Sequence, residues 1–398
     1  MMTTRFQSIN EGESSELGGA GVGTPGVWGE QFSIYLDLVR FLSAAYVMLA
    51  HTKYPRFTDG WLNFAGNFAN DAVMIFFVLS GLVIAHVTFE KERSLGDYVR
   101  ARLSRLWSVA LPALAVTLLA DSVGRQLQPS LYDGAWFAAD QPIWRLLCNA
   151  VFIGEVWYLD FLPFSNVPYW SINYEFWYYA IFGAFVFSTG YWRFLTLGIC
   201  GLICGPKILL LLPVWLLGVA THILVERGRG SMAKGLLLAV LPLVTYALYS
   251  QSGIHGHLGW VVSKWVGAGF RAEQLSWSKN FLSNYVVGFL VASHFYGMAV
   301  LLNASPIFGS AAARVIRVIA GYTFSIYLLH VPLLHFSAAL IQIDPSAKAD
   351  WLLMVAVTAL LIVLIGSVSE HKKHVAKKII LQSQACLGRL LRPLVRSA

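Results

Sequence analysis

Charged residues are scarce in this chain. Only 13% of its 398 residues are charged and 57% are hydrophobic, whereas a soluble protein carries roughly a quarter charged residues. That composition excludes an ordinary soluble enzyme. The net charge of +8 does not indicate a nucleic-acid partner either, because the basic residues cluster between long apolar segments. We therefore expect a membrane protein that binds no nucleic acid.

Cysteines are also few, and none has a spacing typical of metal ligands. Cys200 and Cys204 are one helical turn apart in an apolar segment, where small thiols pack like other hydrophobic side chains. Cys148 and Cys386 stand alone, so we expect no metal site. A secretory signal is missing too, because residues 1–30 are polar and glycine-rich without an apolar core. We expect residues 1–30 to form a flexible cytoplasmic tail.

Long apolar segments, in contrast, are abundant. Each approaches the roughly 20 residues that cross a bilayer as a helix. About ten such segments are present, at 35–51, 69–89, 104–120, 171–187, 192–205, 208–225, 235–250, 281–301, 320–341 and 351–369. The sequence predicts an all-α, polytopic integral membrane protein with about ten transmembrane helices.

The basic clusters indicate its orientation. Alternating spans place most of the 29 Lys and Arg on the side that holds the N-terminus. The positive-inside rule makes that side cytoplasmic, with both termini inside. Residues 371–398 then form a basic cytoplasmic tail. On the opposite side, loop 122–170 is rich in aromatic residues, which is typical of a membrane interface or of a surface that stacks on sugars.

Arg40 and His51 are unusual residues for a membrane span. They are eleven positions apart, which advances the helix by about 16 Å and returns nearly to the same face. Asp37, one turn before Arg40, is placed to pair with it. Charge in hydrocarbon is costly and is typical of a functional site. The alternative is that Arg40 snorkels to the interface and His51 merely ends the helix.

Other spans also carry polar residues. Glu175 lies among aromatic residues at the outer start of the fourth span, where a carboxyl group can exchange protons. His330 lies near the middle of the ninth span, either as a functional group or as a hydrogen-bonded core histidine. Ser80 and Gly81 are two consecutive small residues, which allow another helix to approach closely.

A basic block follows the second span and carries Arg100, Arg102 and Arg105. The planar guanidinium group of arginine suits phosphate oxygens. The alternative explanation is plain topology or contact with anionic lipid, which also favours arginine at the cytoplasmic face.

Five stretches, in order along the chain, resemble the motifs of one family. LDLVRFLSAAYVMLAH resembles a first-helix Arg-x10-His motif, and FFVLSGLVIA, SLGDYVRARLSRLW, VPYWSINYEFWYY and SIYLLHVPLL resemble later motifs. Glu370 corresponds to a closing Glu-x-Pro segment whose proline is missing here. Together, residues 31–370 resemble the transmembrane domain of the membrane-bound acyltransferase 3 family, whose bacterial members O-acylate sugars of surface polysaccharides and related glycans.

The resemblance implies an O-acyltransferase of the bacterial inner membrane. Such an enzyme moves an acyl group, acetyl by default, from cytoplasmic acyl-CoA to a hydroxyl of a surface glycan or exopolysaccharide. Its partners are then membrane lipid, the glycan acceptor and polysaccharide biosynthesis or export proteins. The implied catalytic residues are Arg40, His51, Glu175 and His330. The implied donor-binding residues are Tyr98, Arg100, Arg102 and Arg105, with supporting roles for Asp37, Ser80, Trp170 and Ser171.

Two other functions stay open at this point. A transporter or flippase for a lipid-linked glycan would use the same membrane charges to line a path. The chain shows no internal repeat of the kind that many transporters carry, which argues against this function. A non-catalytic partner of a polysaccharide export complex is the second alternative.

Overall fold

The structure, a computed structural model, describes residues 28–63, 68–134, 136–227 and 230–369. This part of the chain is helical, and the one β-bridge in it is isolated and joins Ala138 to Phe164. Most of the expected N-terminal tail, the tail 371–398 and Glu370 lie outside the described residues.

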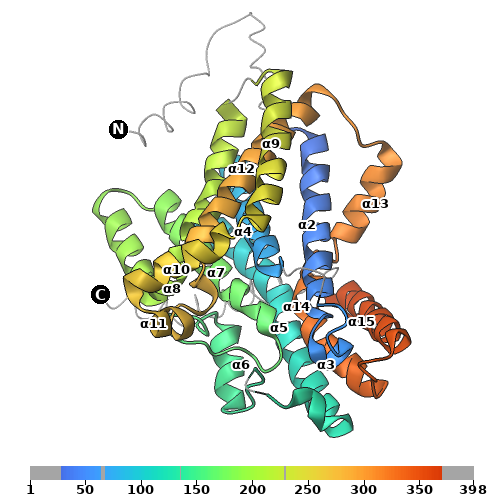
Figure 1. The fold of residues 1–398 in the computed structure, drawn as a ribbon. Helices are drawn as coiled ribbons and strands as arrows, with labels where there is room; N and C mark the ends of the chain where they lie inside the picture. Colours follow the sequence, from blue (N-terminus) through green and yellow to red (C-terminus); the bar gives the residue numbers. More distant parts are fainter. Residues whose placement is uncertain (1–27, 64–67, 135, 228–229, 370–398) are drawn as a thin grey trace, which may run out of the picture.

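Nine long helices form the bundle drawn in Figure 1. They are α2 (Glu30–His51), α4 (Ala69–Lys91), α5 (Leu95–Leu127), α7 (Trp170–Phe187), α8 (Gly190–Arg227), α9 (Met232–Gln251), α12 (Phe281–Ala304), α14 (Thr323–Leu340) and α15 (Lys348–Ser369). Shorter helices connect them: α3 (Pro55–Thr58), η1 (Pro129–Tyr132), α6 (Pro142–Ala150), η2 (Val167–Tyr169), α10 (Ile254–Val266), α11 (Ala268–Glu273), η3 (Ser276–Ser278) and α13 (Ser310–Ala320).

Eight of the described helices are long and apolar enough to cross a membrane: α2, α4, α5, α8, α9, α12, α14 and α15. Each of the ten expected segments coincides with a helix. Segment 171–187 lies on α7, the long helix that is not among these eight, and segments 192–205 and 208–225 both lie on α8. The predicted class, an all-α polytopic membrane protein, is therefore confirmed. The count of ten and the cytoplasmic termini stay predictions.

A sharp bend at Gly205 explains how one helix covers two predicted segments. Its backbone has φ +79° and ψ 176°, a conformation that side-chain-bearing residues rarely adopt. A Cβ atom at this position would lie 2.6 Å from the Cα atom of Trp157. The amide of Trp157 donates a hydrogen bond to the carbonyl of Cys204 at 2.9 Å. The bend thus divides α8 into residues 190–204 and 206–227.

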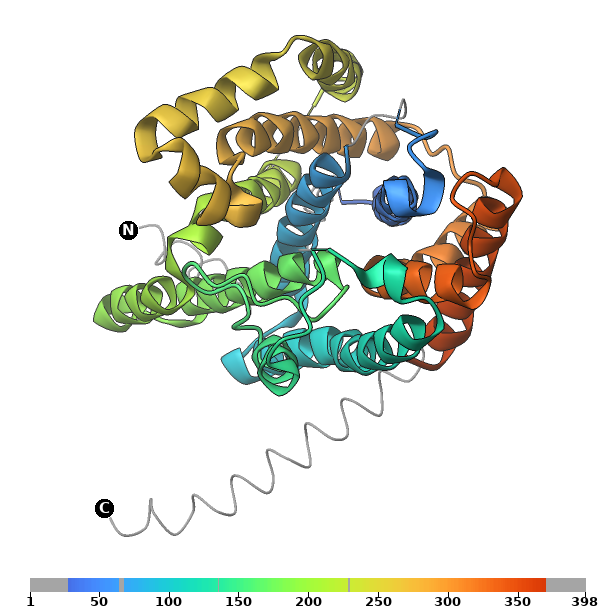
Figure 2. The ribbon, with the colours of Figure 1, turned by 60° about the horizontal axis from the view of Figure 1, so that its bottom comes forward.

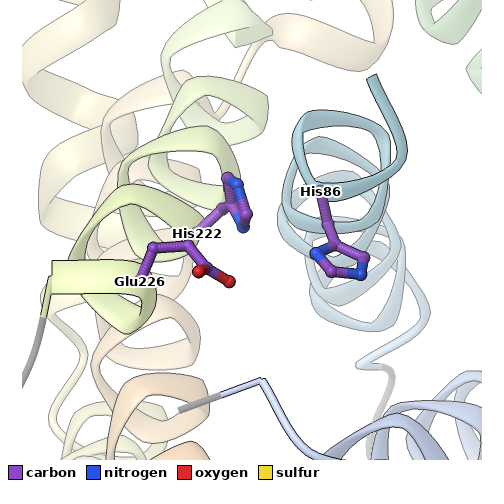
Figure 3. A group of neighbouring side chains, drawn as sticks. All are labelled: His86, His222 and Glu226. Carbon is purple, nitrogen blue, oxygen red and sulfur yellow. The ribbon is translucent and has the colours of Figure 1, made fainter. Parts of the chain in front are cut away.

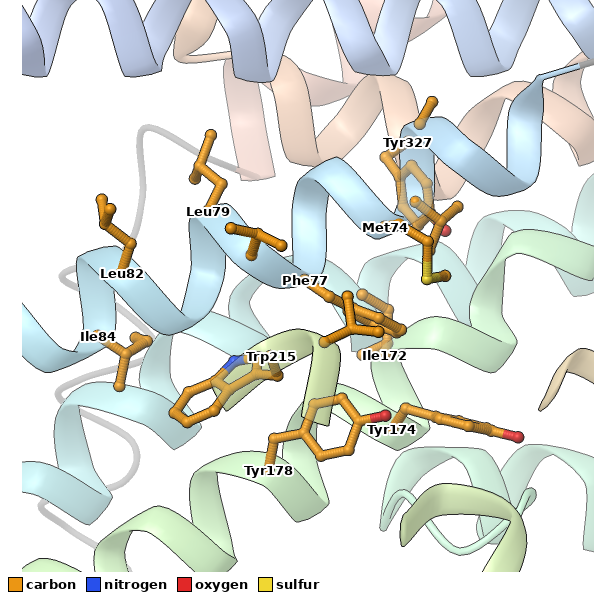
Figure 4. Close-up of a cluster of buried hydrophobic side chains, with 14 of the residues drawn as sticks. Met74, Phe77, Leu79, Leu82, Ile84, Ile172, Tyr174, Tyr178, Trp215 and Tyr327 are labelled. Carbon is orange, nitrogen blue, oxygen red and sulfur yellow. The ribbon is translucent and has the colours of Figure 1, made fainter. Parts of the chain in front are cut away.

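Helix α4 lies at the centre of the bundle, which Figure 2 shows from below. It packs backbone to backbone against α8: a Cβ on Gly81 would lie 2.0 Å from the carbonyl oxygen of Trp215, and one on Gly218 would lie 1.9 Å from that of Val78. The buried Trp215 ring packs against aromatic rings of α7, among them Tyr178, which Figure 4 shows beside it. Small residues permit this approach, as is typical of packed membrane helices.

One buried ion pair holds a loop against the bend of α8. The Lys207 ammonium lies 2.5 Å from a carboxylate oxygen of Glu155, and neither side chain is exposed. Lys207 also donates to the carbonyl of Leu159. Because each charge has a partner, the loop that carries Glu155 can cover this end of the bundle without leaving an isolated charge buried.

Candidate active site

A cavity of about 770 Å³ runs alongside α4. Its lining extends along this helix from Phe76 to Lys91, which corresponds to about 22 Å of helix. Helices α2, α5, α7, α13 and α14 supply the other walls. The cavity is therefore elongated, and its two ends differ in chemistry.

One end of the cavity is basic. Its lining there includes Lys91, Arg100 and Arg317, whereas Arg105, five residues further along α5, lies within electrostatic reach of Arg40 and Tyr179. Arg100 pairs with Asp97 at 2.5 Å and Arg317 pairs with Glu30 at 2.7 Å. Arg105 is exposed and forms no ion pair with the described residues. The cations in the lining outnumber the two carboxylates there, Glu92 and Asp97. Because the planar guanidinium group of arginine suits phosphate oxygens, this end is a favourable place for a phosphate group.

The basic block of the sequence divides between two environments. Arg102 does not line the cavity but pairs with Glu92, and both side chains are buried. Tyr98 is buried too, with the Arg102 guanidinium 5.1 Å from its ring and its hydroxyl donating to the carbonyl of Tyr179 at 2.8 Å. Arg102 is about 200° around the helix from Arg100, so the two cannot face one ligand. The structure thus places Tyr98 and Arg102 in helix packing outside the cavity lining, although Glu92, the partner of Arg102, belongs to that lining.

At its other end the cavity is lined by polar side chains that are hydrogen-bonded to one another or to neighbouring hydroxyl groups. Glu175 accepts hydrogen bonds from the Ser80 hydroxyl at 2.6 Å and from the Tyr179 hydroxyl. The Ser171 and Tyr327 hydroxyls are 2.7 Å apart. These contacts hold the Glu175 carboxyl group at the cavity wall, where it does not reach His51.

Arg40 lies at this polar end, and its guanidinium is 3.3 Å from the Asp37 carboxylate. Both residues line the cavity, and neither is fully buried. Trp170, in contrast, stacks on Trp277 with ring centroids 5.2 Å apart and takes part in packing. Of the expected supporting residues, the structure therefore brings Asp37, Ser80 and Ser171 to the cavity and leaves Trp170 outside it.

His51 and His330 form a pair that lies outside the cavity lining. The Nε2 atom of His330 is 3.1 Å from the Nδ1 atom of His51. One helical turn before His330, Tyr327 lines the cavity, and the two rings are 6.3 Å apart. The histidine pair is therefore separated from the polar end of the cavity by about one turn of α14.

The carbonyl contacts of the two rings determine where their protons lie. His330 Nδ1 is 2.9 Å from the carbonyl oxygen of Ile326, so this nitrogen carries the proton and Nε2 accepts. His51 Nδ1 then faces two acceptors, His330 Nε2 and the carbonyl of Val47 at 2.8 Å. In the neutral His51 ring, Nδ1 must therefore carry the proton, because both of its neighbours are acceptors. This leaves the Nε2 lone pair of His51 free for an incoming proton.

Aromatic rings and a cation surround the far side of His51. The Tyr54 ring is 5.5 Å from the His51 ring, and the Arg56 guanidinium lies 4.6 Å from Tyr54 and 3.7 Å from Trp136. Trp136 belongs to the aromatic loop that the sequence indicated. Arg56 was missed, and so were Tyr179, Tyr327 and Arg317 at the cavity. Tyr179 and Tyr327 had a signal, because both stand in stretches that resemble the family motifs, and so did Arg317, which stands in a basic cluster.

The fold and the cavity define a multi-pass membrane protein with a basic entrance, a polar inner end and a histidine pair close by. The chain belongs to the acyltransferase 3 family, because the family model, described as an acyltransferase domain, matches residues 33–369. It is therefore a membrane acyltransferase, as the motifs predicted. Comparisons with curated proteins and with solved structures find no match.

Proposed function

We propose that the protein transfers an acyl group, acetyl by default, from cytoplasmic acyl-CoA to a hydroxyl of a surface glycan or exopolysaccharide. The observation that carries this proposal is the elongated cavity, which is basic at one end and approaches His51 and His330 at the other. A donor with phosphates at one terminus and a thioester at the other matches that polarity. The bacterial inner membrane is the proposed location.

The donor would lie along α4. Arg100 and Arg105, with Lys91 and Arg317 nearby, would bind its phosphates through charge-assisted hydrogen bonds. The slender arm would extend about 22 Å past the apolar middle of the cavity. The arm would then pass Arg40 and deliver the thioester toward His51, which lies about 16 Å further along α2.

The acceptor would approach His51 from the opposite side. Tyr54 offers an aromatic ring there, 5.5 Å from the His51 ring, and sugars stack on such faces. The free Nε2 of His51 would take the proton of the attacking hydroxyl while its oxygen bonds to the thioester carbon. The C–S bond then breaks, the CoA thiolate leaves and it takes up a proton. His330 would act as a positioning residue, because its Nε2 accepts the Nδ1 proton of His51 and stabilises the imidazolium.

A covalent variant of this reaction gives the same product. His51 Nε2 would attack the thioester first and form an acyl-histidine, and the sugar hydroxyl would then take the acyl group. Both routes need the same free nitrogen. The alternative function, a transporter or flippase for a lipid-linked glycan, predicts substrate movement without release of free CoA.

Labelled acetyl-CoA supplied to membranes tests the proposal. Wild type should release CoA and place label in the glycan fraction, whereas His51→Ala should lose both activities. His257→Ala is a matched control, because this histidine is exposed on α10 and does not line the cavity. Label transfer that survives in His51→Ala would remove His51 from the chemistry, and glycan movement without CoA release would favour the flippase.

A further inference from the structure

A second group of polar side chains lies on the face of α4 that meets α8. His86 of α4 and His222 and Glu226 of α8 each offer one ligand atom, and these atoms lie within 4.8 Å of one another. Figure 3 shows the three side chains directed into the space between the two helices. None of them lines the cavity, so they belong to a different site.

The tight contact between α4 and α8 sets this arrangement. A Cβ on Gly218 would lie 2.7 Å from the backbone nitrogen of Leu82, which fixes the register of the two backbones. His222 and His86 each follow that contact by four residues, so both are one turn further along their helices. Glu226 is one turn beyond His222 on the same face. The register set by the glycine contact and the four-residue spacing therefore bring the three side chains together between α4 and α8.

Both imidazole rings are held in place but incompletely bonded. Trp28 stacks on His86 with ring centroids 3.8 Å apart and an interplanar angle of 9°. Phe89 stacks on His222 at 5.8 Å and 15°. The Nδ1 atoms of both histidines are buried, yet neither has a hydrogen-bond partner among the described residues. Buried nitrogens without partners are rare in folded proteins and point to a ligand that satisfies them.

We propose that His86, His222 and Glu226 bind a divalent transition-metal ion, with Zn²⁺ as the first candidate. Two imidazoles and one carboxylate are a ligand set that Zn²⁺ prefers, with water in the fourth position. Hard cations such as Mg²⁺ prefer an all-oxygen set, which this group does not supply. Glu226 is exposed, so an ion can reach the site from solution. The expectation of no metal site came from the cysteines, whereas these ligands are two histidines and a glutamate on two helices.

The position of the ion suggests a structural role. It would join α4 and α8 near the end of α4 that supplies Lys91 to the cavity and Glu92 to the buried pair with Arg102. A ligand that binds the folded state and not the unfolded state stabilises the fold by mass action. The ion therefore acts on the stability of this helix pair and on the shape of the cavity entrance, and takes no part in acyl transfer.

Metal binding to the full-length chain tests this proposal. The protein would be purified in detergent with a tag that contains no histidine, and Zn²⁺ would be titrated against a chromophoric chelator. We expect one tight Zn²⁺ per chain and an increase in Tm when Zn²⁺ is added. X-ray absorption should show two imidazole nitrogens and oxygen ligands at about 2.0–2.2 Å.

Two matched carboxylate variants make the test specific. Glu226→Gln changes an exposed side chain, so the fold should survive, and it should weaken Zn²⁺ binding at least about tenfold. Glu273→Gln removes an exposed charge on α11, outside this helix pair, and should change the affinity by less than about threefold. His222→Ala should abolish both the binding and the increase in Tm. Absence of stoichiometric binding, or equal affinities in wild type and Glu226→Gln, would overturn the assignment whatever the outcome for acyl transfer.

Discussion

The Nε2 atom of His330 lies 3.1 Å from the Nδ1 atom of His51, although the two residues are 279 positions apart. Helices α2 and α14 bring them together, and each ring is also anchored to a carbonyl of its own helix. The pair leaves one imidazole nitrogen, His51 Nε2, free to act as a base. Its partner is therefore a histidine, whereas Glu175, another residue that the resemblance implies as catalytic, bonds to Ser80 and Tyr179.

Substitution of His330 should affect turnover more than donor binding. His330→Phe removes the acceptor of the His51 Nδ1 proton, so we expect kcat to fall by about 100-fold. The KM for acyl-CoA should stay within about twofold, because His330 does not line the cavity. Steady-state kinetics with purified protein measure both constants. A large increase in KM with unchanged kcat would show that His330 contacts the donor instead of positioning His51.

The two arginines of α5 that line the cavity should matter for the donor. Arg100→Ala combined with Arg105→Ala removes two charge-assisted contacts, so the KM for acyl-CoA should rise at least about tenfold. Raising the salt concentration should increase the KM of wild type more than that of the double variant. Arg125→Ala is the control, because this arginine is exposed near the other end of α5 and does not line the cavity: the donor KM should change little. A change in acceptor dependence alone would refute the donor site.

The ion pair between Glu155 and Lys207 should stabilise the fold only while it is complete. Lys207→Met leaves the buried Glu155 carboxylate without its partner, and we expect a loss of about 3–5 kcal/mol of stability. The double variant Lys207→Met/Glu155→Gln should recover much of that loss. Thermal unfolding in detergent measures both effects. A single variant as stable as wild type would indicate that the pair is hydrated and weak.

The close contact between α4 and α8 should not tolerate a methyl group. In Gly218→Ala the new Cβ would lie 1.9 Å from the carbonyl oxygen of Val78, so the helices must separate. We expect a loss of about 1–3 kcal/mol from overpacking. Gly198→Ala is the control, because its Cβ would meet nothing within 4 Å and a helical glycine is replaced by a better helix former. Equal stability of the two variants would contradict the packing described for Gly218.

The helices could be predicted because hydrophobicity is a local property. Each apolar segment of about 20 residues must form its backbone hydrogen bonds internally, which in a membrane requires a helix. The bend at Gly205 was also visible as a break between two segments. That the two halves would meet at a sharp bend, with no loop between them, was not, since the bend depends on the contact of Gly205 with Trp157.

Side-chain partners were harder to predict, because most join residues far apart in the chain. Asp37 and Arg40 were paired correctly, as neighbours one turn apart. Glu175 bonds to Ser80, which is 95 positions away, and no spacing reveals that contact. Arg102 is different: its position opposite Arg100 follows from helical geometry alone, so the sequence already held the reason to separate them.

The most direct test follows the acyl group across the membrane. Sealed inside-out vesicles that enclose the glycan acceptor would receive labelled acetyl-CoA, which does not cross the bilayer, on their outer surface. That surface is the cytoplasmic face, where we place Arg100 and Arg105. The account predicts label on the enclosed glycan with wild type and none with His51→Ala, whereas right-side-out vesicles should show no transfer until they are opened. Equal labelling in both orientations of sealed vesicles would contradict delivery of the acyl group through the protein.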